Sequence, residues 1–287
     1  MKNKVREKSL FEYKLKYATA SIGKYFTLIL GAAVAIIPIM VIFLSSIKTK
    51  KDYDSSPNPL SLPTSITFQH YIDAFTKGDM VTGFKNTFLI LVVVLAAKII
   101  LGAAAAYVLH RFRFRGKKII MGAFLMATFV PAIVNNIIVY QIISSIGLFN
   151  TLGAVMLLGI GTDVISMYIF LQFLDSIPVS LDESAMLDGA SYFTIFRKII
   201  FPLLKPAIAT VGILQGVALY NDFYTPYLYM PDPNLSTIAT ALYRFKGPNG
   251  SDWQIIAAGV MIIIIPTLIV FLALQKQIYN GIQGSVK

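Results

Sequence analysis

The sequence contains no cysteine and only two histidines, His70 and His110, among its 287 residues. The absence of cysteine excludes disulfides and thiolate metal sites, and two histidines are too few for a histidine-based metal or catalytic cluster. Charged residues make up only 14%, against about a quarter in soluble globular domains. The hydrophobic fraction is 56% and the mean hydropathy is +0.70. This composition argues against a mostly water-exposed protein and favours a membrane protein.

Long apolar stretches account for this composition. A helix needs about 20 apolar residues to cross a bilayer, and six stretches qualify: 25–47, 86–109, 119–145, 154–174, 207–229 and 255–274. The third and fifth are interrupted, by Pro131 and by residues 221–226. The first is too long for the apolar part of a signal peptide and no small-residue cleavage site follows it, so we expect it to be retained.

We therefore predict an all-α integral membrane protein of about six transmembrane helices, with one membrane domain at residues 25–274. The net charge of +11 follows the topology, because lysine and arginine gather in alternate short segments. These basic segments are the N-terminal residues 1–24, the loops after the second and fourth spans, and the C-terminal residues 275–287. Positive charge is retained on the cytoplasmic side, so both termini are expected there, and nucleic acid is not needed to explain the charge.

The loop between the fourth and fifth spans, residues 177–206, has the pattern of two short helices joined by a turn. Ser180 and Glu183 have the spacing of a capping box that starts the first helix. Asp188 and Gly189 are expected to end it, because glycine tolerates a left-handed cap.

Ser191 is expected to cap the second helix of this loop. Apolar side chains recur at helical spacing in it, at Tyr192, Ile195, Phe196 and Ile199, and Pro202 and Pro206 are expected to stop it. Such an apolar stripe must pack against its own bundle, the bilayer surface or a soluble partner, and the residues alone do not choose among these.

This loop resembles the EAA loop of ABC importer permeases, whose pattern is E-A-A, three residues, G, nine residues and I-x-L-P. The matching positions are Glu183, Ala185, Gly189, Ile199 and Pro202, whereas Ser184 and Phe201 depart from the pattern. Further segments resemble the carbohydrate-uptake branch of that family: residues 106–116 (A-Y-x-x-x-R-F-x-F-x-G), 147–151 (G-L-x-N-T), 221–226 (N-x-F-x-x-P, with Tyr220 where tryptophan is usual) and 281–287, a Gly-rich tail.

The resemblance implies a permease subunit that imports a sugar in the cytoplasmic membrane of a bacterium or archaeon. It implies that residues 191–200 form a coupling helix docked on a separate ATPase subunit, with Glu183 available to pair with a basic group there. The implied coupling residues are Glu183, Ala185, Asp188, Gly189, Ser191, Tyr192, Phe196, Ile199 and Pro202. The implied partners are two ATPase subunits, a second homologous permease and an extracytoplasmic sugar-binding protein.

ATP hydrolysis is not expected on this chain. It lacks the G-x-x-x-x-G-K-[ST] loop, since residues 116–118 have neither the upstream glycine nor the following hydroxyl residue. No cofactor or metal is expected on the chain, and ATP and magnesium are expected on the ATPase. The alternatives are a cargo such as glycerol-3-phosphate or another polyol derivative, or a gradient-driven secondary transporter or channel. A membrane enzyme is disfavoured because no catalytic cluster is visible.

Polar residues within the spans are candidates for the translocation path: Asn135, Asn136, Asp163, Asn221 and Asp222. Asn135 and Asn136 can instead make interhelical hydrogen bonds, and Asn221 and Asp222 can shape a helix end. Lys98 can pair with Asp163 or extend its side chain to the cytoplasm. Tyr220, Phe223 and Tyr224 can stack on sugar rings or belong to an interfacial aromatic belt.

Overall fold

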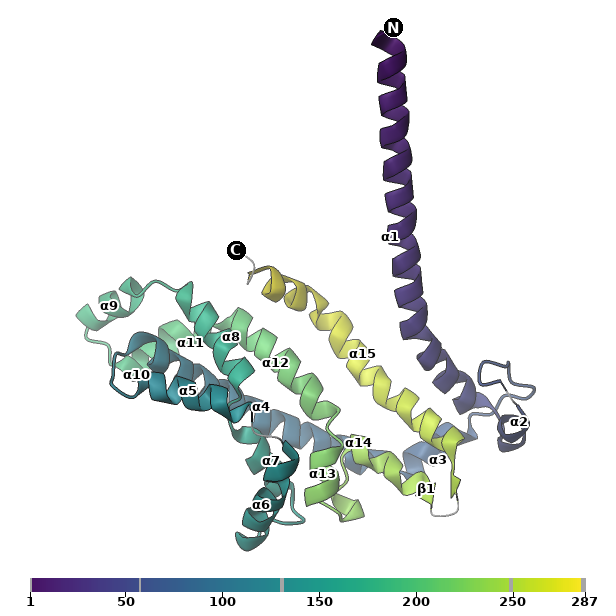
Figure 1. Cartoon of the computed structure of the whole chain (residues 1–287). Helices are drawn as coiled ribbons and strands as arrows, with labels where there is room; N and C mark the ends of the chain where they lie inside the picture. The colour runs from purple at the N-terminus through teal and green to yellow at the C-terminus, as the bar shows by residue number, and fades with distance from the viewer. Residues whose placement is uncertain (1, 57, 130–131, 248–249, 285–287) are drawn as a thin grey trace.

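The computed structural model describes the backbone of residues 2–56, 58–129, 132–247 and 250–284, and the side chains of residues 21–56, 58–129, 136–247, 251–273 and 275. Its described part is almost entirely helical (Figure 1), and the single sheet consists of β1 (Lys246–Gly247) paired antiparallel with β2 (Gly250–Ser251). The predicted all-α class is therefore confirmed, with a minimal hairpin added before the last helix.

The first and last long helices are α1 (Lys2–Ile47) and α15 (Trp253–Gly284), and they pack on each other. The remaining helices are α2 (Lys50–Ser55), α3 (Gln69–Lys77), α4 (Met80–Arg111), α5 (Lys117–Ala127), α6 (Ala132–Ser145), α7 (Leu152–Ile160), α8 (Val164–Asp175), α9 (Ser180–Leu187), α10 (Tyr192–Ile195), the π-helix η1 (Phe196–Ile200), α11 (Phe201–Leu203), α12 (Lys205–Tyr220), α13 (Tyr224–Tyr229), the 3-10 helices η2 (Pro233–Leu235) and η3 (Leu242–Phe245), and α14 (Ile238–Ala241) between them.

Three of the predicted spans lie on helices long and apolar enough to cross a membrane: Ser21–Ile47 within α1, Met80–Arg111, and Trp253–Ala273 within α15. Their apolar side chains face outward over much of the surface, as at Ile22, Phe26 and Phe88, each more than 65% exposed. Exposed apolar surface on this scale requires lipid or protein around it.

The other three spans are each divided in the structure. An interruption was expected in the third and in the fifth, whereas the break in the fourth was not. The third is divided into α5 and α6, with a turn at Thr128 after α5. The fourth is the pair α7 and α8, bent by 43°. The fifth ends at Tyr220, nine residues before the predicted end, and α12 meets the preceding short helices at 72°. Counting each bent pair as one span gives up to five spans among the described residues.

Helix α4 is the central element, and α7, α8, α12 and α14 all pack on it. At its N-terminal end the polar residues are buried and hold the segment after α13. Asn86 Nδ2 donates to the Ser236 carbonyl at 3.0 Å, and Thr87 Oγ1 accepts from the Ile238 amide at 2.9 Å. Gly83 allows this approach, because a Cβ there would lie 3.3 Å from the Ile238 backbone.

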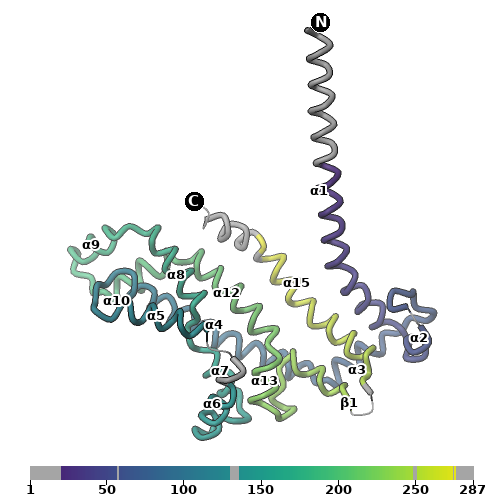
Figure 2. The backbone as a smooth tube through the Cα atoms, viewed as in Figure 1, coloured from purple at the N-terminus to yellow at the C-terminus, as the bar shows by residue number. Residues whose placement is uncertain are grey.

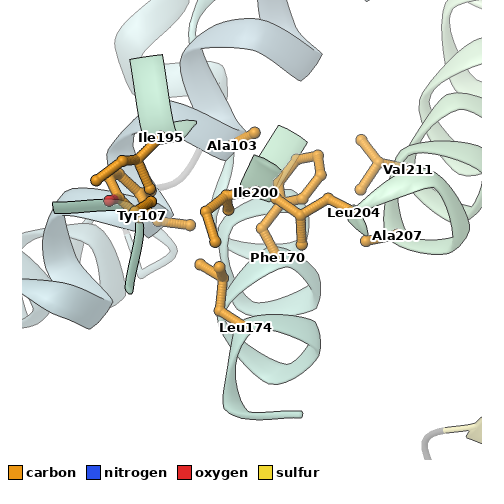
Figure 3. Packing of buried hydrophobic residues seen from close by; sticks show 11 residues of the cluster. Ala103, Tyr107, Phe170, Leu174, Ile195, Ile200, Leu204, Ala207 and Val211 are labelled. Atoms are coloured by element: carbon orange, nitrogen blue, oxygen red, sulfur yellow. The ribbon is translucent and has the colours of Figure 1, made fainter. Parts of the chain in front are cut away.

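The buried apolar side chains along α4 fall into separate clusters. The cluster toward its C-terminal end, which we call the inner core, consists of Ala103, Ala106, Tyr107, Phe170, Leu174, Ala185, Ile195, Ile200, Leu204, Ala207 and Val211. Figure 3 shows these side chains converging from α4, α8 and α12 and from the loop helices. The cluster nearer its N-terminal end, the outer core, consists of Ile90, Val94, Ile143, Ala154, Val155, Tyr229 and Met230. A third cluster lies between α3, α14 and α15.

Candidate coupling site

The predicted helix–turn–helix of residues 177–206 is present, and α9 and α10 lie together at the extremity of the molecule remote from α2, α3 and β1 (Figure 2). Helix α9 ends in a Schellman turn: Gly189 N–H donates to the Met186 carbonyl and Ala190 N–H to the Ala185 carbonyl, both at 3.0 Å. Gly189 has φ +81°, a conformation that costs an L-residue energy. The prediction that Gly189 ends this helix is confirmed.

The start of α9 differs from the prediction. The N-cap is Val179, Ser180 is the first helical residue, and no side chain caps the helix. The predicted capping box of Ser180 and Glu183 is therefore wrong. The Val179 backbone is already helical, with φ −62° and ψ −27°, and its carbonyl accepts from the Asp182 amide at 2.9 Å, so Ser180 stands inside the helix instead of at its cap. The Glu183 side chain is left exposed and unconstrained by a cap.

The second helix begins as predicted and then widens. Ser191 Oγ accepts from the Thr194 amide at 3.3 Å, which confirms it as the cap. The next five residues form the π-helix η1, in which the Phe201 amide bonds to the Phe196 carbonyl. Pro202 cannot donate a helical hydrogen bond, and a wide turn before it accommodates that loss. Pro202 and Pro206 were predicted to stop this helix, and it ends between them, at Leu203.

The apolar stripe of this second helix divides between two environments. Ile195 is fully buried in the inner core, and Phe196 and Ile199 are partly buried against it. The Phe196 ring lies 5.4 Å from the Tyr107 ring. Tyr192 lies 4.9 Å from Phe112 yet remains 52% exposed. The loop is thus fixed to its own bundle by part of the stripe, and another part of its apolar surface is free.

Buried polar groups on α4 fix the first helix of the loop. Tyr107 Oη donates to Asp182 Oδ1 at 2.8 Å, and Arg111 Nε lies 3.0 Å from Asp182 Oδ2. The Arg111 and Asp182 side chains are 6% and 5% exposed, and their contact is an ion pair without an aligned hydrogen bond. An Arg111 Nη atom also donates to the Ile177 carbonyl at 2.9 Å. We call Tyr107, Arg111 and Asp182 the loop anchor.

The loop anchor was not predicted, although a signal for it was present. Tyr107 and Arg111 stand four residues apart, so both project from one face of a helix. An acidic residue on a facing loop is the natural partner for both, and Asp182 is one turn into α9. A second contact fixes the approach to the loop, where His110 Nε2 lies 2.8 Å from Asp175 Oδ1.

The outward side of the loop carries exposed apolar residues beside charges. Leu187 is 90% exposed, Phe193 70% and Tyr192 52%. Around them stand exposed charged residues of both signs: Glu183, Asp188, Arg197 and Lys198. Apolar side chains within a charged rim are typical of protein interaction sites. We call Leu187, Tyr192 and Phe193 the docking face.

The predicted coupling residues differ in how far they are buried. Glu183, Asp188, Gly189, Ser191 and Tyr192 are exposed, whereas Ala185 is buried at 8% exposure, and Phe196 and Ile199 are half-buried. Pro202 lies in α11 and is exposed. The structure brings these residues into one loop, and their contact with an ATPase remains a prediction. Leu187 and Phe193 were missed because the resemblance assigned them no role.

Lys98 and Asp163 form the intramembrane pair that the sequence left open. Lys98 Nζ lies 3.2 Å from Asp163 Oδ2 and donates to Gln215 Oε1 at 2.9 Å, and the whole residue is 9% exposed. The pairing is confirmed in place of extension toward the cytoplasm. Asp163 is also the N-cap of α8, accepting from the Ser166 amide at 2.9 Å.

The other candidates for the translocation path make hydrogen bonds within the bundle. Asn136 Nδ2 donates to the Tyr224 hydroxyl at 3.2 Å, the interhelical alternative foreseen for it. Asn221 Nδ2 donates to the Val217 carbonyl, and Asp222 Oδ1 accepts from the Thr225 amide, so both shape the break between α12 and α13. The Asn135 side chain lies outside the described residues. Contact of these residues with a cargo remains a prediction.

Aromatic residues near this break pack on one another. The rings of Phe223 and Tyr227 are stacked at 5.2 Å, and Tyr243 lies 4.9 Å from Tyr227. Tyr220 instead donates from its hydroxyl to the Ile263 carbonyl at 2.9 Å. Tyr220 therefore has a structural role between α12 and α15, and Tyr224 is engaged by Asn136.

The sequence matches one protein-family model and curated transport permeases. The family model described as "Binding-protein-dependent transport system inner membrane component" matches residues 98–283. Among curated relatives, the multiple sugar-binding transport system permease protein MsmG of Streptococcus mutans is 33% identical over 270 residues, covering 92% of this chain and 96% of its own length. The melibiose/raffinose/stachyose import permease protein MelC of Bacillus subtilis is 29% identical, covering 88% of this chain and 91% of its own length.

A solved structure supports the fold. A chain of a bacterial ABC transporter involved in the import of the acidic polysaccharide alginate aligns with a TM-score of 0.78 at 22% identity, covering 89% of this chain and 95% of that one. At this identity the likeness establishes the fold alone. The arrangement of α4, α7, α8 and α12 around the loop is therefore that of an importer permease.

Proposed function

Because this chain belongs to the family of binding-protein-dependent transport system inner membrane components, we propose that it is the transmembrane permease subunit of an ATP-driven importer of a sugar or oligosaccharide. The observation that carries the proposal is the loop of residues 177–206, which is held by buried groups and presents the docking face outward. A soluble partner is favoured over the bilayer surface because exposed charges of both signs, Glu183, Asp188, Arg197 and Lys198, belong to the same loop.

The docking face binds a cleft on an ATPase subunit. Leu187 and Phe193 supply the apolar contact, and Glu183 is free to pair with a basic group of the ATPase because no helix cap engages it. Gly189 sets the angle between α9 and α10 and so places both halves of the face. Closure of two ATPase subunits on ATP and magnesium displaces the loop, and the bundle transmits that movement to the translocation path.

The bundle carries the displacement because the loop is continuous with its packing. The inner core joins Ala185, Ile195 and Ile200 of the loop to Phe170 of α8 and Val211 of α12. The loop anchor adds a buried ion pair to α4. Since close-packed interiors deform little, a push on α10 moves α8 and α12 together rather than compressing the space between them.

The cargo is a sugar, as the named specificities of the relatives indicate. Melibiose, raffinose and stachyose are stated for one of them and multiple sugars for another. An extracytoplasmic binding protein delivers the cargo, and a second, homologous permease completes the path. The loop and both chain ends lie on the cytoplasmic side, in agreement with the distribution of lysine and arginine.

The test is a gentle affinity purification of this chain from its host membranes, with stoichiometric partners identified by mass spectrometry. A second permease and an ATPase are expected, and sugar uptake by the reconstituted complex should require ATP and the binding protein. A homogeneous particle without ATPase, obtained under conditions that preserve other importers, would contradict the proposal.

A further inference from the structure

Lys98, Asp163 and Gln215 join three helices in the middle of the bundle. Lys98 comes from α4 and Gln215 from α12, while Asp163 stands at the break between α7 and α8. The ammonium lies 3.2 Å from the carboxylate and 2.9 Å from the amide oxygen. Ser166 Oγ donates to the same Asp163 oxygen at 2.7 Å. We call Lys98, Asp163 and Gln215 the polar joint.

The polar joint lies at the boundary between the two apolar cores. Along α4 the outer core ends at Val94 and the inner core begins at Ala103, so Lys98 falls between them. From α7 to α8, Val155 belongs to the outer core and Phe170 to the inner core, with Asp163 between. These two chain segments thus pass from one core to the other at the same level.

Gln215 completes this boundary on α12. Val211 belongs to the inner core, whereas Leu219 packs against the outer one. Glycines on either side of this level allow α4 to approach the α7–α8 pair closely: a Cβ at Gly159 would lie 2.7 Å from the Val94 side chain, and one at Gly102 would lie 2.9 Å from Thr162 Oγ1. The helices therefore pack tightly on either side of the joint.

The helix break coincides with this boundary. Helices α7 and α8 meet at 43°, and the Asp163 carboxylate both caps α8 and pairs with Lys98. The two halves of the fourth span are consequently free of a shared helical hydrogen-bond ladder at the point where the cores separate. The Lys98 side chain links this break to α12, through its contacts with Asp163 and Gln215.

We propose that the polar joint is the pivot of the permease, the fixed point about which the inner core and coupling loop rotate against the outer core during each ATP cycle. The residues of the joint are positioning residues: they contact neither ATP nor the docking face. This inference rests on the proposed function and adds to it the element that converts loop displacement into movement within the membrane.

The chemistry of the joint suits a pivot. A lysine and a carboxylate within a membrane are costly when separated, so the pair resists sliding of α4 past the break. A charged hydrogen bond nevertheless tolerates rotation about its own position more readily than an interlocked apolar contact. Loss of the pair should therefore leave the ATPase attached to the permease, while ATP hydrolysis no longer drives sugar transport.

The experiment compares variants of the complete, reconstituted importer by the ratio of ATP hydrolysed to sugar transported. Lys98→Met and Asp163→Asn are each expected to retain the ATPase in the complex and to raise this ratio at least fivefold. The exchange variant Lys98→Asp with Asp163→Lys is expected to restore much of the coupling. Lys85→Met is the matched control, because Lys85 is an exposed lysine of the same helix.

The outcomes separate this inference from the proposed function. An unchanged ratio in both single variants, or a proportional loss of hydrolysis and transport in fully assembled complexes, would overturn the pivot. If the single variants fail to accumulate, the double variant Lys98→Gln with Asp163→Asn replaces both charged side chains by neutral amides. Normal coupling in that variant would also overturn the pivot. Absence of an ATPase from the wild-type complex would instead refute the proposed function.

Discussion

Replacement of Gly189 by alanine tests the placement of the docking face. Gly189 has φ +81°, and a Cβ built there would meet nothing within 4 Å, so alanine would cause backbone strain without a clash. Left-handed backbone costs an L-residue about 1–2 kcal/mol. The turn can release this strain by opening, and the fraction of loops with the correct angle between α9 and α10 then falls.

The expected effect follows from this population shift. A penalty of about 1–2 kcal/mol changes an equilibrium by about 5- to 30-fold, and the apparent Kd for the ATPase rises by up to that factor as the competent fraction falls. The assay is titration of the purified ATPase onto permease complexes held in nanodiscs. Gly189→Asn should weaken binding less, because asparagine tolerates the left-handed region better than alanine.

Gly147→Ala is the matched control for this experiment. Gly147 also has positive φ, +73°, with nothing within 4 Å of a Cβ, but it lies in the turn after α6. It should introduce the same strain without changing ATPase affinity. Equal affinities for wild type and Gly189→Ala, or equal losses from both alanine variants, would refute the reasoning that the turn angle controls docking.

Further predictions concern the loop anchor, the docking face and the far end of α4. Asp182→Asn leaves the buried Arg111 guanidinium without its ion-pair partner and should lower the free energy of unfolding by up to about 3–5 kcal/mol, seen as a lower Tm of the detergent-solubilised complex. Asp54→Asn, at an exposed aspartate, is the control, and equal Tm values for the two variants would count against the anchor. Leu187→Glu and Phe193→Glu should abolish ATPase association while the Tm of the permease measured without ATPase stays unchanged. Leu62→Glu, at a residue 78% exposed outside the loop, should not weaken association, and retained association in the first two variants would show that the face is not used. Asn86→Ala removes the donor to the Ser236 carbonyl and should destabilise the attachment of the segment after α13 by about 1–3 kcal/mol, measured as faster proteolysis of that segment. Lys85→Ala is the control, and cleavage of Asn86→Ala no faster than that of the control would contradict this prediction.

Local chemistry made parts of the coupling loop predictable. Gly189 ends its helix because no other residue enters the left-handed region as cheaply, and Ser191 caps the next because its hydroxyl reaches the Thr194 amide. Lys98 and Asp163 could be named as one possible pair because an isolated charge within a membrane is costly, although the residues alone left extension of the lysine toward the cytoplasm open. These inferences depend on a residue's own backbone or on a cost that few partners can offset.

The errors arose where neighbouring segments decide the outcome. Ser180 and Glu183 have the spacing of a capping box, but the backbone is already helical at Val179, so the serine lies inside the helix. The fourth apolar stretch hides a break because Asp163 is satisfied as a cap and by Lys98 from another helix. The pairing of Arg111 with Asp182 depends on how α4 and α9 are placed, which no local pattern specifies.

The most direct measurement uses the absence of cysteine from this chain. A single cysteine introduced as Phe193→Cys, in the membrane-bound complex, is treated with a short thiol-reactive photo-crosslinker, and Leu62→Cys serves as the comparison. The account predicts a crosslink from position 193 to the ATPase subunit that changes in yield when ATP is added, and none from position 62. No crosslink from position 193 in an active complex, or equal crosslinking from both positions, would contradict the assignment of the loop as the coupling element.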